Sequence, residues 1–390
     1  MIQMKLPKLL RNKNKILRHR NADFVLDNFL VTGFREIMLP LHILQCLTLA
    51  PKYSIYYNLL TSNSRRTNMF IVATALIISL KYSYEAVVFM NIVKDNFNPT
   101  YLLLVYIQLW SFFATFVVNS LLTVLRSETN AHLIIKLQRI YSSYKFVQIE
   151  EKHTKIINWI LFFCIIVYHV TTYILRRQIS NDPIVYAVLN QVFVLVSDCN
   201  NIYIARVLII FKNAILSWIR EYQQILNTTI TEADDIRSNI SKLERTYNEL
   251  IEVLRMFQSV FGIPIACFVV TTFIQALANV QTIIEEPSWN FHFIFALTWT
   301  IRNILLLIVI SMECEDIYMS MKNIQSTRMV ARMEYENSGA WNVGGAYGEL
   351  TADATLTACD MLTVDATLPT RLLATIATYA VVLLQIKFLS

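Results

Sequence analysis

Seven apolar stretches, each long enough to cross a lipid bilayer as a helix, dominate this sequence. They cover residues 69–90, 101–125, 156–175, 184–204, 257–283, 291–314 and 372–389. About 20 consecutive apolar residues cross the hydrocarbon core as an α-helix. Charged residues make up only 16% of the chain, compared with about 25% in soluble domains. We therefore expect an all-α membrane protein with seven transmembrane helices.

The distribution of lysine and arginine predicts the orientation of these helices. Eleven of these residues precede the first stretch, and most others lie in the second, fourth and sixth connections. The first, third and fifth connections hold only Lys94, Arg176 and Arg177. Because basic residues are retained on the cytoplasmic side, the N-terminus is expected to be cytoplasmic and the C-terminus extracellular. The sequons at Asn227 and Asn239 then face the cytoplasm and stay unmodified.

Helices are also expected outside the bilayer. Residues 232–255 carry apolar residues at helical spacing, and acidic residues gather at the start of this segment. We predict that this segment continues into the fifth span as one long helix, and that residues 206–222 similarly extend the fourth span. Residues 37–50 are too short to span and contain Pro40, so an interfacial or re-entrant helix is expected there.

These observations divide the chain into four parts. Residues 1–68 form a cytoplasmic segment with the interfacial helix, and residues 69–314 form spans one to six with their cytoplasmic extensions. Residues 315–370 form a cytoplasmic loop with a glycine-rich stretch and an anchor segment, and residues 371–390 form the seventh helix.

The seventh span carries a row of polar and apolar side chains on one face. Thr375, Thr378, Val382 and Gln385 are spaced so that they share this face. Hydrocarbon offers no hydrogen bonds to threonine or glutamine. One interpretation is a helix that lines water together with symmetry-related copies, and the alternative is a polar contact between packed helices.

This segment resembles the C-terminal signature of the insect gustatory receptor family, in which Thr-Tyr and five hydrophobic residues precede Gln-Phe. Thr378, Tyr379 and Gln385 match the signature, and the likeness extends upstream through residues 356–359 and 362–369. It is greatest to the bitter-type receptors of moths and butterflies. Ile386 and Asp360 depart from the pattern, where phenylalanine and glycine are usual.

The resemblance implies a ligand-gated, non-selective cation channel in the plasma membrane of sensory neurons. It also implies a homo- or hetero-tetramer held by a cytoplasmic anchor domain, and a small-molecule tastant, most simply a bitter plant compound, as ligand. Thr378, Val382 and Gln385 would face the pore, where Val382 contributes a hydrophobic constriction. Membrane lipid is the other expected partner.

Polar and aromatic residues in the outer halves of the spans are candidates for a ligand pocket, because such pockets are mostly apolar with a few placed polar groups. The same residue types also form interfacial belts and helix contacts, and His169 alone is more often a packing residue. The candidates are Gln108, Trp110, Tyr168, His169, Asn190, Gln191 and Trp299.

Charged residues inside spans are expected to be paired, because an unpaired charge in the bilayer is costly. Lys81 and Glu85 lie one helical turn apart. Asp198 and Arg302, lower in the fourth and sixth spans, are expected to join a polar network between helices, unless Arg302 snorkels to the interface.

Other function classes find little support. No protease, hydrolase or nucleotide-binding motif is present, and no cysteine or histidine spacing suits a metal, so neither enzymatic activity nor a cofactor is expected. The basic N-terminus is expected to determine topology and not to bind nucleic acid. A G-protein-coupled receptor requires the opposite orientation. The sequence also allows a second interpretation, an auxiliary subunit without its own pore, because Ile386 and Asp360 depart from the family pattern.

Overall fold

The structure is a computed structural model. It describes residues 28–56, 58–93, 99–143, 147–179, 184–227, 233–285, 291–337, 357–358 and 362–389. The glycine-rich residues 338–349, the sequon residues Thr228 and Thr229, and Asp360 lie outside these ranges.

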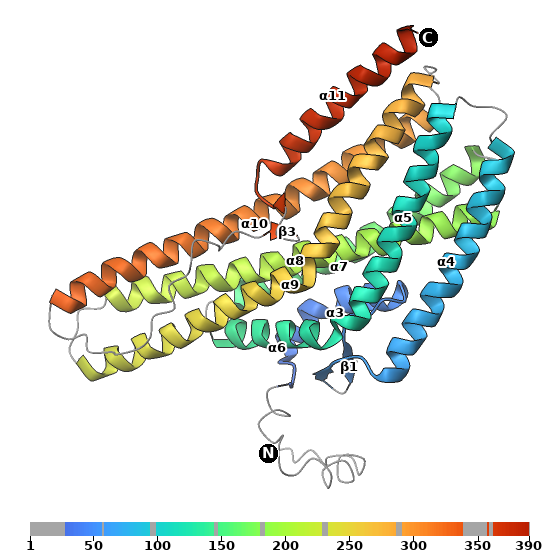
Figure 1. Ribbon diagram of the computed structural model, residues 1–390. Coiled ribbons are helices and arrows are strands. Elements are labelled where there is room, and N and C mark those ends of the chain that lie inside the picture. The colour runs from blue at the N-terminus through green and yellow to red at the C-terminus, as the bar shows by residue number, and fades with distance from the viewer. Residues whose placement is uncertain are drawn as a thin grey trace, which may run out of the picture.

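Helices make up nearly all of the described chain (Figure 1). In order, the elements are α3 (Thr32–Leu47), β1 (Ser54–Tyr56), β2 (Leu59–Thr61), α4 (Arg65–Val93), α5 (Pro99–Leu125), α6 (Ser127–Ser143), α7 (Val147–Ile179), α8 (Ile184–Asn227), α9 (Ala233–Glu285), α10 (Phe291–Asn337), β3 (Thr357–Ala358), β4 (Leu362–Thr363) and α11 (Leu368–Leu389).

Six helices in the described residues are long and apolar enough to cross a membrane. These spans lie in α4, α5, α7, α8, α9 and α11. The remaining predicted span, residues 291–314, is also helical and forms the first part of α10, although it does not meet the same criterion within the described residues. The all-helical prediction is therefore confirmed.

Three helices run far beyond their predicted spans. Helix α8 continues to Asn227, and α9 begins at Ala233, as the periodicity predicted. Helix α10 continues to Asn337, although its residues from 315 onward were expected to belong to a loop. These three extensions project to one side of the spanning bundle, with α6 and α3 beside its base (Figure 1).

The largest hydrophobic core is centred in this lower region and continues upward between α9, α10 and α11. It joins α3 and α6 to the lower parts of α8, α9 and α10. Trp218 is fully buried in it, stacks on Tyr222 and donates a hydrogen bond from Nε1 to the carbonyl of Leu243, 3.0 Å away. Satisfying the indole N–H is what allows so large a side chain to be buried completely.

Helix α3 is longer than expected and is buried rather than lying on a surface. Phe34, Ile37, Met38, Leu41 and Leu44 are all buried, and the helix packs against α7 and α8. The following β1–β2 hairpin pairs Ser54 with Thr61, and Asn58 lies at its turn with a positive φ of 66°. Asparagine tolerates this left-handed conformation better than most residues.

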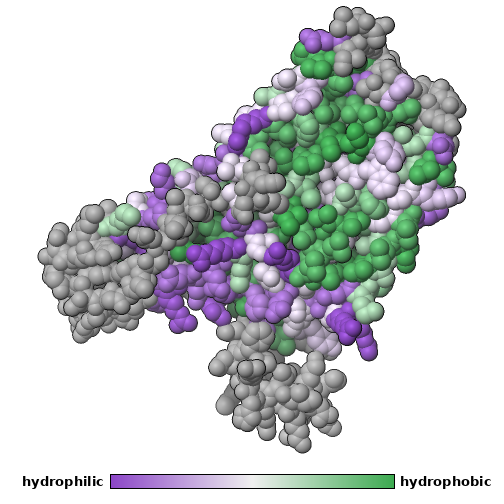
Figure 2. All heavy atoms as spheres, in the orientation of Figure 1, coloured by the Kyte–Doolittle hydropathy of each residue, from purple (hydrophilic) through white to green (hydrophobic). Residues whose placement is uncertain are grey.

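The molecular surface separates into two chemical regions. Hydrophobic residues cover the face formed by α4, α5 and the upper part of α9, whereas hydrophilic residues gather over the lower extensions (Figure 2). Ile156, Ile160, Phe163, Val167 and Val170 form a further exposed apolar row along α7. Such exposed apolar surface suits contact with lipid.

Candidate functional site

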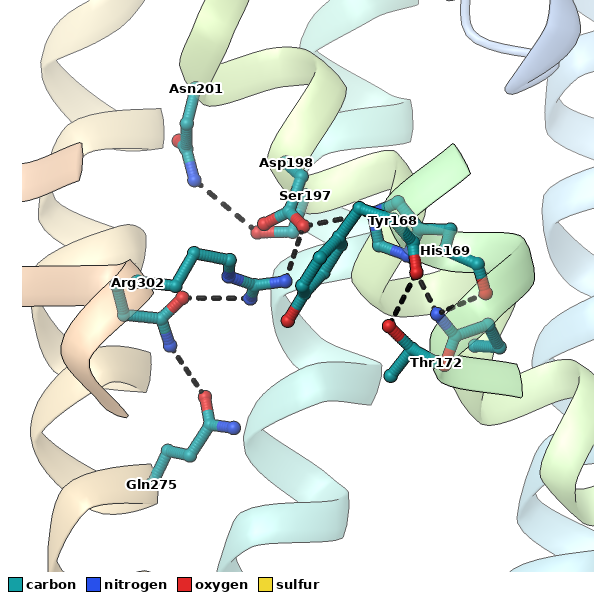
Figure 3. Close-up of polar contacts among 10 residues, drawn as sticks. Tyr168, His169, Thr172, Ser197, Asp198, Asn201, Gln275 and Arg302 are labelled. Atoms are coloured by element: carbon teal, nitrogen blue, oxygen red, sulfur yellow. Dashed lines mark hydrogen bonds and ion pairs between the residues drawn. The ribbon is translucent and has the colours of Figure 1, made fainter. Parts of the chain in front are cut away.

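A carboxylate on α8 is the centre of a buried polar network between four helices (Figure 3). Asp198 is 6% exposed, and its Oδ2 atom lies 2.7 Å from a guanidinium nitrogen of Arg302 on α10. The same oxygen lies 3.0 Å from Nε2 of His169 on α7. The expected contact between Asp198 and Arg302 is thus confirmed, and Arg302 does not snorkel away from the bundle.

The imidazole of His169 connects this carboxylate to a second amide. Nε2 of Gln191 on α8 lies 2.7 Å from Nδ1 of His169. Because an amide NH₂ group can only donate, Nδ1 accepts, and a neutral imidazole then carries its proton on Nε2, facing Asp198. A hydrogen bond of this kind determines which ring nitrogen is protonated.

On the opposite side, Arg302 begins a chain of amides that reaches α9. Its second terminal nitrogen donates to Oδ1 of Asn303 over 2.8 Å, and Nδ2 of Asn303 donates to Oε1 of Gln275 over 2.8 Å (Figure 3). Gln275 and Asn303 are both buried. The network therefore links α7, α8, α10 and α9 through consecutive polar contacts.

Aromatic rings cover the charged centre. The guanidinium carbon of Arg302 lies 5.3 Å from the ring centroid of Tyr168 and 5.1 Å from that of Trp299. Trp299 also contacts Phe112 of α5, at 6.3 Å between ring centroids. A cation placed over aromatic faces is stabilised by the ring quadrupoles, more so where water is excluded.

The structure brings four of the seven candidate pocket residues into this cluster: Tyr168, His169, Gln191 and Trp299. Asn190, the residue before Gln191 on α8, is also buried. Its Oδ1 has no hydrogen-bond partner among the described residues. Trp110 is 40% exposed and contacts Tyr106 and Phe113 on its own helix. Neither Trp110 nor Gln108 contributes a contact to the network.

Sequence reasoning assigned the members of this network to different depths. It placed His169 in the outer half of its span, but Asp198 and Arg302 lower in theirs. The observed contacts show that these residues lie at one level. Apolar runs locate a helix only to within a few residues, so the vertical stagger between neighbouring helices could not be read from them.

A second set of polar contacts lies nearer the lower region that holds the largest core. The sequence did not predict these contacts. Arg206 on α8 is 6% exposed and donates from Nε to Oδ1 of Asn158 over 2.6 Å. Nδ2 of Asn158 donates in turn to the carbonyl of Ile37 on α3, 2.8 Å away. A buried asparagine that satisfies both a charged side chain and a helix carbonyl fixes how α3 packs on α7 and α8.

The last helix is attached to the bundle along one side. Leu372 and Ile376 are buried, and the ring of Tyr379 contacts Phe273 of α9 at 5.8 Å between centroids. Thr375, Thr378, Val382 and Gln385 are exposed, so the whole predicted row is uncovered in the single chain. In Figure 1, α11 lies at the edge of the bundle beside α10 and α9.

The carboxylate of Asp365 organises the turn just before α11. Oδ1 of Asp365 accepts hydrogen bonds from the backbone N–H and the hydroxyl of Thr367, and from Arg371 at 2.6 Å. Desolvation acts to raise the pKa of Asp365, but these hydrogen bonds and the charge of Arg371 outweigh it and lower the pKa. A negative charge beside the N-terminus of a helix is stabilising.

Comparisons with known proteins agree with this architecture. A model of the 7tm chemosensory receptor family matches residues 40–339, which is most of the chain. The chain belongs to this family. The receptor is accordingly a multi-pass membrane protein. A search of curated proteins found no matching sequence.

Among solved structures, the receptor is similar to the insect olfactory receptor OR5 from Machilis hrabei. The TM-score is 0.60 at 13% sequence identity, and the match covers 90% of this chain and 98% of the olfactory receptor. At so low an identity the match concerns the fold. The buried network of this chemosensory receptor therefore has to be interpreted from its own residues.

Proposed function

We propose that this chemosensory receptor is a ligand-gated, non-selective cation channel of the gustatory type. It acts in the plasma membrane of sensory neurons and opens in response to a small tastant, most simply a bitter plant compound. The observation that supports the proposal best is the uncovered face of α11. This face carries Thr378, Val382 and Gln385, whose mixture of polar and apolar side chains suits a water-filled pore better than lipid.

Four copies of the chain would together surround such a pore, with one α11 helix from each. Val382, which is 43% exposed in the single chain, would form the hydrophobic constriction, and Gln385 would offer its amide to passing ions. The long extensions of α8, α9 and α10 would hold the subunits together. The buried core that these extensions share supports this role.

The ligand would bind beside the buried network, where Tyr168, His169, Gln191 and Trp299 lie. A ligand opens the channel only if it binds the open arrangement more tightly than the closed one. The network offers a way to achieve this difference, because it holds four helices in one arrangement. Groups on the ligand that compete for the amides or for Asp198 would favour another arrangement.

Helix α9 connects this region to the pore. Gln275 ends the amide chain, and Phe273, two residues earlier on the same helix, contacts Tyr379 of α11. Movement of α9 at the network would therefore reach α11 in part through this aromatic contact. Gln275 and Phe273 act here as positioning residues.

Whole-cell current in cells that express this chain alone, challenged with a panel of plant bitter compounds, tests the proposal. Gln385→Ala should change rectification or ion preference, because it removes the pore amide. Leu384→Ala, on the neighbouring position and 40% exposed, is the matched control and should leave ion preference unchanged. Equal effects of the two substitutions would place Gln385 outside the pore.

Two other outcomes would change the proposal. A response that requires G proteins would contradict the channel mechanism. A current that appears only when partner receptors are expressed with this chain, and keeps its ion preference in Gln385→Ala, would indicate an auxiliary subunit without its own pore.

A further inference from the structure

Lys52 is a buried amine that has no counter-charge among the residues that the structure describes. It precedes the β1–β2 hairpin and is 6% exposed. Its Nζ atom lies 5.4 Å from the ring centroid of Tyr203 on α8 and 5.3 Å from that of Phe261 on α9. Among the residues that the structure describes, its ammonium group makes no ion pair and no hydrogen bond.

The titratable groups on the surrounding elements do not supply a negative charge. Those that are neutral or cationic are His42 and Cys46 on α3, Tyr53 before the hairpin, Tyr203 and Arg206 on α8, Arg255 on α9, and Arg126, which contacts Ser259 of α9. Glu36 of α3 is paired with Lys155, and Asp198 of α8 with Arg302. The carboxylates of α9 that face α6 are paired elsewhere, since Glu252 contacts Lys136 and Glu249 contacts Arg139.

Burial without a partner favours the neutral amine of lysine. An ammonium loses its hydration on burial, and two aromatic faces replace only part of that loss. Desolvation accordingly lowers the pKa of Lys52 from 10.5 to about 7. Changes of pH near neutrality therefore add or remove a positive charge inside the lower core, where Lys52 is buried.

The position of this amine gives the charge a mechanical consequence. Phe261 lies three residues before Pro264, which is inside α9. Proline cannot donate the hydrogen bond to the carbonyl of Val260, so a helix bends at such a position. In Figure 1, α9 changes direction between its lower extension and its upper, spanning part.

We propose that Lys52 is a proton-binding site that controls how tightly the hairpin segment packs against the bend of α9. The neutral amine favours the packed arrangement, and the ammonium loosens it. Because the upper part of α9 carries Phe273 against Tyr379, proton binding also alters the opening of the pore. This last effect rests on the proposed channel function, whereas the proton site itself does not.

The sign of the pH dependence follows from the two states of the amine. In the packed arrangement Lys52 binds its proton less tightly than in water, so packing strengthens as pH rises from 7 toward 10.5. Between pH 7 and 8.5 the packing equilibrium should change about tenfold, because each pH unit in this window contributes up to a factor of ten. Below pH 7 the contribution of Lys52 to the packing equilibrium should no longer change with pH.

Thermal unfolding of the full chain in lipid nanodiscs between pH 6 and 8.5 tests the proton site. The wild-type midpoint should rise from pH 7 to 8.5, whereas Lys52→Met, which is neutral at every pH, should lose this rise. Lys322→Met, which changes an exposed lysine of α10, is the matched control and should keep it. A wild-type rise that persists unchanged in Lys52→Met would overturn the proposal.

A second variant decides the matter if Lys52→Met does not fold. Lys52→Arg keeps a permanent charge, so its midpoint should be lower than that of the wild type at pH 8.5 and should not rise from pH 7. A rise equal to that of the wild type would overturn the proposal.

Recording currents at pH 7 and 8.5, on the side of the bilayer that carries α3 and the hairpin, then tests the consequence for gating. The ligand-evoked open probability should differ between the two pH values in the wild type and not in Lys52→Met. Absence of any current together with the expected unfolding data would contradict the channel function while leaving the proton site established. A pH-insensitive current would overturn the proposed link to gating.

Discussion

At the scale of single residues, several buried polar side chains in this receptor pair with one another, although other buried polar atoms have no hydrogen-bond partner among the described residues. Asp198 is compensated by Arg302 and His169, and Asn158 is bonded to both Arg206 and α3. Within a bilayer no water is available to replace a lost partner. Removing one member of a pair should therefore reduce the stability of the folded receptor more than removing both members together.

Replacement of Asp198 by asparagine should destabilise the receptor by about 3 kcal/mol, because it leaves the buried charge of Arg302 uncompensated. The double variant Asp198→Asn/Arg302→Met should recover much of this loss. Unfolding of the purified receptor in nanodiscs measures both. A double variant no more stable than the single one would show that the two residues are not coupled.

His42 on α3 should make the receptor sensitive to acid. Its ring stacks on Tyr53 at 5.2 Å, and desolvation lowers its pKa from 6.5 to about 4. The folded state thus binds fewer protons than the unfolded state in this interval. The corresponding stability is present above pH 6.5 and is lost as pH falls toward 4, by at most about 3 kcal/mol.

Unfolding midpoints between pH 7 and 4 measure this effect. His42→Phe should flatten the pH dependence, whereas His153→Phe, at an exposed position of α7, should not. Equal flattening by both substitutions would assign the acid sensitivity to something other than burial of His42.

At the scale of elements, α9 contacts both the proposed pore helix α11 and helices that carry the network. It packs against α5, α6, α8, α10 and α11, and it carries Gln275 of the network and Phe273 of the aromatic contact. Thr271 adds a hydroxyl contact to Thr115 of α5 at 2.8 Å. The direction of α9 above Pro264 therefore affects both the network and α11.

Replacement of Pro264 by alanine should straighten α9, because the carbonyl of Val260 regains its helical hydrogen bond. The upper part of the helix then moves, and cross-linking of Phe273→Cys to Tyr379→Cys by a short thiol reagent should fall several-fold. Pro369→Ala is the control, since a proline in the first turn of α11 does not bend the helix. Unchanged cross-linking in Pro264→Ala would show that the proline does not determine the path of α9.

At the scale of the whole molecule, the receptor consists of an apolar spanning bundle above a helical base with its own core (Figure 1, Figure 2). The base buries large side chains such as Trp218, whereas the spans of α4, α5 and α7 stay largely exposed on their outer faces. A base of this kind can stay assembled while the spans rearrange.

The distribution of basic residues predicts that the base is cytoplasmic. Asn227 and Asn239 should then carry no glycan, whereas a sequon on a 20-residue linker appended after Ser390 should be modified. A mass shift on glycosidase treatment distinguishes the two sites in expressing cells. Modification of Asn227 or Asn239 without modification of the appended sequon would reverse the predicted orientation.

Much of the fold could be predicted from local patterns. The apolar runs located the spans, and the periodicity of residues 232–255 predicted that α9 continues below the bilayer. The Lys81–Glu85 ion pair, at 2.7 Å, followed from helical spacing alone. These features depend on residues near one another in the chain, so the sequence expresses them directly.

Only the tertiary structure decided which side chains meet between helices. The contacts His169–Asp198 and Asn303–Gln275, and the enclosure of Lys52 by Tyr203 and Phe261, join segments far apart in the chain. Such contacts depend on the stagger and rotation of each helix. These are determined by packing of the whole bundle and not by the pattern of any one segment.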